Sequence, residues 1–176
     1  ERGFLKHQFI SGAGSFFFYM RASGAPPFLL VTSRPGTKLE YFAAGGRSGG
    51  TMFVHSAKTG PAEKAGTWRQ PHTALELKAG GTASYGFRFQ WASSYDELRD
   101  LLYADGLFDI RVVPGMTVPS DLPARFSVRT RARMEAVRAE STADKPISTL
   151  SNAACPGGQA RVYEASFRKL GENLIT

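Results

Sequence analysis

The sequence has 176 residues, 42% hydrophobic and 12% aromatic, and its 22 Lys and Arg outnumber its 15 Asp and Glu to give a net charge of +7. Plentiful aromatics and a charged fraction of only 21% exclude a disordered chain. The longest apolar clusters, Ser15–Met20 and Pro26–Val31, fall far short of the roughly 20 residues that a membrane-spanning helix needs, so we expect no membrane partner.

Short runs of aromatic and β-branched residues alternate with Gly, Pro and Ser through the first half of the chain. This spacing is typical of an antiparallel sandwich or barrel, whereas a parallel α/β sheet would place helical patterns between its strands. The predicted strands are Phe4–Ile10, Ser15–Ala22, Phe28–Ser33, Lys38–Ala43, Thr51–Ser56, Thr73–Lys78 and Ser84–Trp91.

The last of these strands has the strictest alternation of apolar and polar residues. Tyr85, Phe87, Phe89 and Trp91 share one face, while polar or small residues occupy the other. A strand with this pattern is half-buried, and we expect its aromatic face to lie in the core.

One helix is predicted over Ser94–Asp105. Ser94 can accept the N-terminal backbone hydrogen bonds, Glu97 completes a capping box three residues later, and three leucines form an apolar stripe. Gly106 follows as a typical C-terminal stop.

Beyond the helix, the pattern again favours strands. These are Leu107–Val113, Ala124–Thr130 and Arg161–Lys169, whereas Ala132–Glu140 combines a helix-favouring composition with strand-like neighbours and stays open. The predicted fold is all-β, an antiparallel β-sandwich with one short helix. We expect one domain over residues 1–176, because the roughly 20-residue loop Glu140–Gln159 leaves only about 17 residues after it, too few for a second core.

The loop around Trp68, Arg69 and His72 is the strongest candidate binding segment. Aromatic faces stack on sugar rings, and Arg and His side chains hydrogen-bond to hydroxyl groups. In the alternative interpretation, Trp68 packs beneath the sheet and Arg69 is a solvated edge residue.

No cofactor or metal is expected. His55 and His72 would need a third ligand such as Glu63, and their spacing lacks the short intervals that metal sites show. The single cysteine, Cys155, cannot form an internal disulfide and is interpreted as a free surface thiol.

Four arginines stand at even spacing: Arg125, Arg129, Arg131 and Arg133. A strand that continued through them would place them on one face as a basic stripe, which we expect to contact an adjacent domain or an acidic polymer. Nucleic acid is a weaker alternative, because no recognised nucleic-acid-binding motif accompanies the stripe.

Four segments together carry a family resemblance: Ser84–Ala92, Tyr95–Leu98, Gly106–Met116 and Leu170–Asn173. In these segments the chain resembles the N-terminal β-supersandwich of large secreted microbial proteins related to six-hairpin glycosidases. The resemblance implies a galactose-mutarotase-like sandwich that precedes an (α/α)-toroid bearing the catalytic acids. This chain is too short to include a toroid, so we expect a fragment or module of a longer secreted protein whose signal lies outside this sequence.

The resemblance implies a noncatalytic, carbohydrate-associated module of a glycoside-hydrolase-like protein, with carbohydrate or an adjacent domain as its partner. The alternative is a glycan-cleaving enzyme in its own right, in which Asp105 and Asp109 act as acid and base. No residue pattern in the sequence identifies a catalytic group.

Overall fold

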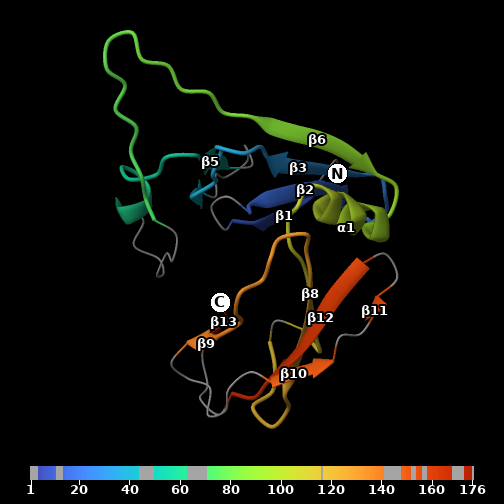
Figure 1. Ribbon diagram of the computed structural model, residues 1–176. Coiled ribbons are helices and arrows are strands. Elements are labelled where there is room, and N and C mark those ends of the chain that lie inside the picture. Colours follow the sequence, from blue (N-terminus) through green and yellow to red (C-terminus); the bar gives the residue numbers. More distant parts are fainter. Residues whose placement is uncertain are drawn as a thin grey trace. The chain divides into compact units, whose positions relative to one another are not determined.

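The computed structural model describes residues 4–10, 14–43, 50–62, 71–115, 117–140, 148–151, 154–155, 158–167 and 173–175. The chain divides into two compact units, Glu1–Leu98 and Arg99–Thr176, and each is described by itself. The predicted fold class is confirmed, because the described strands pair in antiparallel sheets and are accompanied by a single α-helix (Figure 1). The single-domain organisation stays a prediction.

Unit 1 is built on a four-stranded sheet in the order β1 (Phe4–Phe9), β2 (Phe16–Arg21), β3 (Phe28–Ser33) and β6 (Phe87–Ala92). The start of α1 (Tyr95–Ala104) covers one face. There the Tyr95 ring lies 4.5 Å from that of Phe28, and its hydroxyl donates to Met20 Sδ at 3.2 Å. This face, with the fully buried Leu30 at its centre, is a well-packed core.

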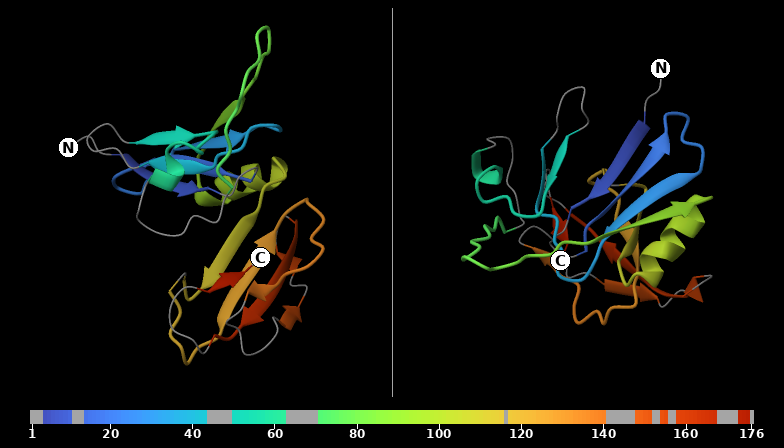
Figure 2. Two further views of the ribbon diagram at one scale, coloured as in Figure 1. Left: turned by 90° about the vertical axis from the view of Figure 1, so that its left-hand side faces the viewer. Right: turned by 90° about the horizontal axis from the view of Figure 1, so that it is seen from above.

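The opposite face of the same sheet is only partly covered. At one end, Phe17, Val31 and Leu39 form a buried cluster against Met52 and Val54, at and after the second strand of the hairpin β4 (Tyr41–Ala43) and β5 (Thr51–Phe53). The two turned views in Figure 2 place this hairpin and α1 on different sides of the sheet. The rest of the face has no cover among the described residues.

The prediction that the aromatic face of β6 lies in the core is therefore wrong. Phe89 and Trp91 are 65% and 66% exposed, whereas Ala92 on the other face is buried. Strict alternation shows that the two faces differ in chemistry. It does not show which face another element covers, and here the helix covers the face with fewer large apolar side chains.

One further predicted strand is absent from the structure, and the segment whose type stayed open forms little regular structure. Thr73–Lys78 forms no strand; residues 71–86 make the long green arm that follows the short helix η1 (Gly60–Ala62) and leads into β6 in Figure 1. Ala132–Glu140 forms no helix, and only its end pairs, as β9 (Ala139–Glu140) with β13 (Leu174–Ile175).

The helix prediction is confirmed to within one residue at each end. Ser94 Oγ accepts the Glu97 N–H at 3.1 Å, and the Glu97 carboxylate accepts the Ser93 N–H at 2.7 Å. Gly106 follows the helix at φ = 76°, a conformation that glycine adopts without a Cβ penalty.

Unit 2 holds the second large sheet, in the order β10 (Ser148–Ser151), β12 (Gly158–Ala165), β8 (Ala124–Arg129) and β7 (Asp109–Val113), with β11 (Ala154–Cys155) beside β12. Its core is a cluster of Phe126, Val128, Tyr163 and Ala165. The Phe126 and Tyr163 rings, directly opposite in register, stack at 5.2 Å.

Candidate functional site

A buried carboxylate organises one side of unit 1. Glu40, immediately before β4, is only 4% exposed and has no cationic partner among the described residues. Its Oε2 accepts the Ser56 N–H, the Ser56 hydroxyl and the Thr73 N–H, each at 2.9 Å, and its Oε1 accepts the Thr73 hydroxyl. Four donors saturate the acceptor capacity of a carboxylate.

These hydrogen bonds decide the charge state of Glu40. Burial by itself raises the pKa of the carboxyl, but the hydrogen bonds from Thr73 and Ser56 outweigh it and hold the pKa below its usual range. Glu40 is therefore an ionised acceptor at neutral pH. It also fixes the start of the arm through Thr73, which explains why the predicted strand does not form there.

From Glu40 a chain of hydrogen bonds runs to the surface. His55 Nδ1 lies 2.8 Å from Thr73 Oγ1, and His55 Nε2 lies 2.6 Å from the Tyr85 hydroxyl. The His55 and Tyr85 rings meet edge-on, with centroids 5.5 Å apart. We call Glu40, Thr73, His55 and Tyr85 the polar relay; its outermost member, Tyr85, is exposed.

His72 joins the same carboxylate by a second branch. Its Nδ1 lies 2.7 Å from Ser56 Oγ, which in turn donates to Glu40. The imidazole lies so close to Gly60 that a Cβ there would stand 2.2 Å from its Cε1. Gly60 thus makes room for the ring.

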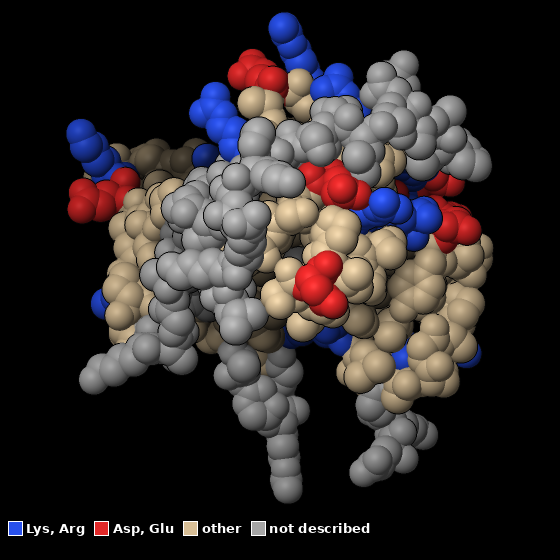
Figure 3. Space-filling model, turned by 90° about the horizontal axis from the view of Figure 1, so that it is seen from below, with Lys and Arg blue, Asp and Glu red and all other residues tan. Residues whose placement is uncertain are grey.

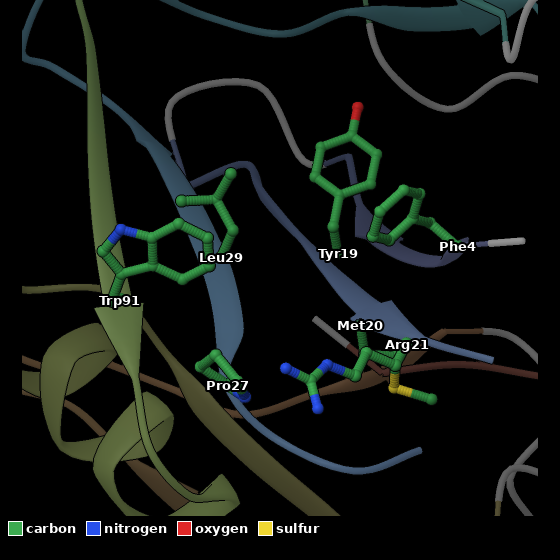
Figure 4. A pocket seen from close by; sticks show the side chains of 7 residues that line it. All are labelled: Phe4, Tyr19, Met20, Arg21, Pro27, Leu29 and Trp91. Atoms are coloured by element: carbon green, nitrogen blue, oxygen red, sulfur yellow. The ribbon is translucent and has the colours of Figure 1, made fainter. Parts of the chain in front are cut away.

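An open hollow lies at the far end of the uncovered sheet face. It has a volume of about 520 Å³ and is lined by residues of β1, β2, β3 and β6 and by Pro27, just before β3 (Figure 4): Phe4, Tyr19, Met20, Arg21, Pro27, Leu29 and Trp91. The strand register brings three of these residues side by side, because Leu29 pairs with both Tyr19 and Trp91. Arg21, directly opposite Phe4, is the only charged residue of the lining within the part of the chain that the structure describes.

Tyr85 and the aromatic residues of β6 lie between the polar relay and the hollow. Phe87, Phe89 and Trp91 share one face of β6, Tyr85 stands two positions before the strand, and all four are exposed. We call this row the aromatic track. It runs from the polar relay at Tyr85 to the hollow at Trp91.

The residues predicted as carbohydrate contacts are only partly described. Trp68 and Arg69 lie outside the described residues, and so does Glu63. His72 is described and is bound to Ser56. Although His55 and His72 approach one carboxylate by separate branches, no group of three metal-ligating side chains exists in the described part of the chain. The Cys155 side chain is also outside the described set.

The four arginines of the predicted stripe have separate environments. The strand β8 ends at Arg129, which is buried with Nη2 2.7 Å from Asp100. Arg125 is exposed and pairs with Glu164 at 2.9 Å, while Arg131 lies over the Tyr103 ring. On the face shown in Figure 3, basic and acidic side chains are interspersed. Contact of this stripe with a polyanion stays a prediction.

Asp109, the predicted acid or base, is enclosed by arginines. It is 6% exposed, Arg99 Nε donates to its Oδ1 at 2.9 Å, and Arg129 Nε lies 3.5 Å from its Oδ2. Asp105 stands in the turn after α1. This surrounding holds the Asp109 carboxylate in ion pairs rather than presenting it to a ligand.

Glu40, Arg21 and Phe4 did not stand out in the sequence. Glu40 carried a weak signal, because a lone carboxylate between Leu39 and Tyr41 must find donors if the strand is buried. Arg21 and Phe4 carried none, since their meeting depends on strand register.

Comparison with known proteins gives a fold relation. No family model matches the sequence, and no curated protein sequence matches it either. Among solved structures, a polysaccharide lyase is similar at 16% identity and a TM-score of 0.55, over 97% of this chain and 23% of the lyase. The chain thus has the fold of part of a carbohydrate-active enzyme and spans about a quarter of its length. Within the described residues, no helix has the length and apolarity needed to cross a membrane.

Proposed function

We propose that the chain is a noncatalytic, carbohydrate-associated module of a larger secreted protein and that it contacts glycan along the aromatic track. The observation that carries the proposal is the exposure of Trp91 and Phe89 beside the hollow. Contiguous exposed apolar surface marks interaction sites, and aromatic faces suit the C–H surfaces of sugar rings. The fold similarity to a polysaccharide lyase supports the carbohydrate context.

The noncatalytic role is favoured over glycan cleavage by the state of the predicted acids. Glycoside hydrolysis needs a pair of carboxyl groups that face the same substrate. Asp109 faces Arg99 and Arg129 instead, and Glu40 is saturated by hydrogen bonds. An adjacent domain on the aromatic track is the competing occupant.

A Trp91→Ala variant tests the proposal. Binding to a panel of soluble polysaccharides is measured by isothermal titration calorimetry, with Phe108→Ala as the control because Phe108 is an exposed aromatic residue outside unit 1. We expect the Trp91 variant to lose affinity at least about tenfold, or about 1.4 kcal/mol, and the control to keep it. No reducing sugar is expected to be released.

Two results would contradict the proposal. One is the absence of binding to every polysaccharide in the panel, which would favour an adjacent domain on the track. The other is unchanged affinity in Trp91→Ala, which would move any glycan site elsewhere, with the predicted Trp68 segment as the next candidate.

A further inference from the structure

We propose that the glycan is acidic and lies in one direction along the aromatic track, with a carboxylate at Arg21 and a hydroxyl donor at Tyr85. This inference rests on the proposed function, and it specifies the ligand class of that site. It follows from the opposite hydrogen-bonding character of the two ends of the track.

At the Tyr85 end, the direction of every proton in the polar relay is determined by Glu40. An ionised carboxylate only accepts hydrogen bonds, so the single hydroxyl proton of Thr73 points to Oε1. Thr73 Oγ1 can then only accept from His55 Nδ1, which must carry a proton.

In the neutral form of an imidazole only one nitrogen is protonated, so a His55 ring that is neutral and protonated at Nδ1 has an accepting Nε2. The Tyr85 hydroxyl therefore donates its only proton inward to Nε2. The Tyr85 oxygen can then only accept a hydrogen bond from a ligand. Such a group receives a sugar hydroxyl, which has a proton to donate, and repels a carboxylate or sulfate, which has none.

The hollow end has the opposite character. Arg21 has five N–H donors and no acceptor, and among the described residues its side chain has neither an ion-pair nor a hydrogen-bond partner. Among the described residues, no Asp or Glu lines the hollow. A guanidinium in the lining of the hollow can recognise a planar carboxylate by paired hydrogen bonds, and Trp91 and Tyr19 line the same hollow.

The distance between the ends requires a polymer. Tyr85 and Trp91 are six positions apart, and at about 3.3 Å per residue the track is about 20 Å long. A monosaccharide cannot reach both ends. An oligosaccharide stacked on Phe87, Phe89 and Trp91 can satisfy both at once.

The experiment compares acidic polysaccharides with their neutral counterparts. Polygalacturonate, alginate and hyaluronan, each intact and carboxyl-reduced, are titrated at about 0.15 M salt, where unspecific charge attraction is screened. The variants are Arg21→Gln and Tyr85→Phe, and Arg138→Gln is the control because it removes the same charge from an exposed position in unit 2 that lies outside the predicted arginine stripe.

We expect the unmodified protein to bind at least one acidic polymer at least tenfold more tightly than its reduced form. Arg21→Gln should abolish this preference while leaving affinity for the reduced polymer unchanged, and Arg138→Gln should preserve it. Tyr85→Phe should weaken the acidic and the reduced forms by the same factor. Equal binding of acidic and reduced polymers would overturn the inference yet leave the proposed function intact, whereas no binding to any polymer would contradict the proposed function itself.

The relay has a spectroscopic test of its own. Nitrogen chemical shifts of the His55 ring report which nitrogen carries the proton, and we expect protonation at Nδ1 in the neutral ring. Thr73→Val removes the acceptor of that proton and should shift the population toward the Nε2-protonated form. A neutral His55 protonated at Nε2 in the unmodified protein would overturn the assigned direction.

Discussion

Each of the two units contains a buried carboxylate, and the two carboxylates are stabilised by different kinds of partner. In unit 1, Glu40 is surrounded by neutral donors from Ser56 and Thr73. In unit 2, Asp109 is placed between two guanidinium groups, and Arg129 also reaches Asp100. The first arrangement keeps a net negative charge inside the protein, whereas the second cancels it.

The Glu40 cluster orients hydrogen-bonding groups that reach the surface, whereas the ion pairs of Asp109 stabilise the fold of unit 2. The charge of Glu40, which has no cationic partner among the described residues, orients the donors of Thr73, His55 and Tyr85 inward, so its influence extends to the hydroxyl of Tyr85 at the surface. The charges around Asp109 are paired with one another, although the buried Arg129 Nε makes no hydrogen bond among the described residues, and they impose no direction on a ligand. Breaking each arrangement should therefore have different consequences.

The largest effect is expected from Arg129→Met. The Arg129 side chain is 7% exposed, and its loss leaves Asp109 with Arg99 alone and removes the contact with the Tyr103 ring. Removing one partner of a buried ion pair typically costs about 3 to 5 kcal/mol. Chemical denaturation should show a loss of about 3 kcal/mol.

A double variant, Arg129→Met with Asp109→Leu, distinguishes two causes of the lost stability. One is the loss of attraction within the ion pair, and the other is the cost of leaving the Asp109 charge buried with fewer partners. Apolar replacement of a whole buried pair is often nearly neutral, so we expect the double variant to recover most of the stability that the single variant loses. Additive destabilisation would mean that the pair contributes a large net attraction.

Glu40→Gln should have a smaller effect that depends on pH. The variant keeps one oxygen but faces hydroxyl and amide donors with an NH₂ group, which should cost about 2 kcal/mol at pH 7. Because the pKa of Glu40 is lower in the folded than in the unfolded protein, its stabilisation is present above the unfolded pKa of about 4.3 and is lost as pH falls through the folded pKa.

The measurement is the difference in unfolding free energy between the unmodified protein and Glu40→Gln from neutral pH down into the acid range. The difference should shrink below about pH 4, where the unfolded carboxyl takes up its proton. The exposed Glu76 in the same arm provides the control as Glu76→Gln. A difference that stays constant across this range would contradict an ionised Glu40.

The sequence predicted those parts of the fold that depend on local patterns. The helix and most strands were recognised because capping residues and alternation act within a few positions. The face of β6 that is covered could not be inferred, since coverage depends on where α1 and the β4–β5 hairpin pack. Thr73–Lys78 looked like a strand, but Thr73 is held by the distant Glu40.

The candidate site was predictable only in its chemistry. His72, one of the three predicted contact residues, belongs to the Glu40 cluster, and its part in carbohydrate binding stays a prediction. Tyr85 and Trp91 were identified as one row, although as core. The meeting of Arg21 with Trp91 and of His55 with Tyr85 arises from pairings across the sheet and between loops, which no local pattern encodes.

The smallest effect is expected where charge is paired at the surface. Arg125 and Glu164 face each other across β8 and β12 at 2.9 Å, with the Arg125 side chain 64% exposed. Exposed pairs contribute little because water and salt screen them, so Arg125→Ala should change the unfolding free energy by no more than about 0.5 kcal/mol, and less in high salt. Denaturation at low and high salt measures it. A loss comparable to that of Arg129→Met would place Arg125 in the buried ion cluster, and the contrast between the two kinds of arginine on β8 would fail.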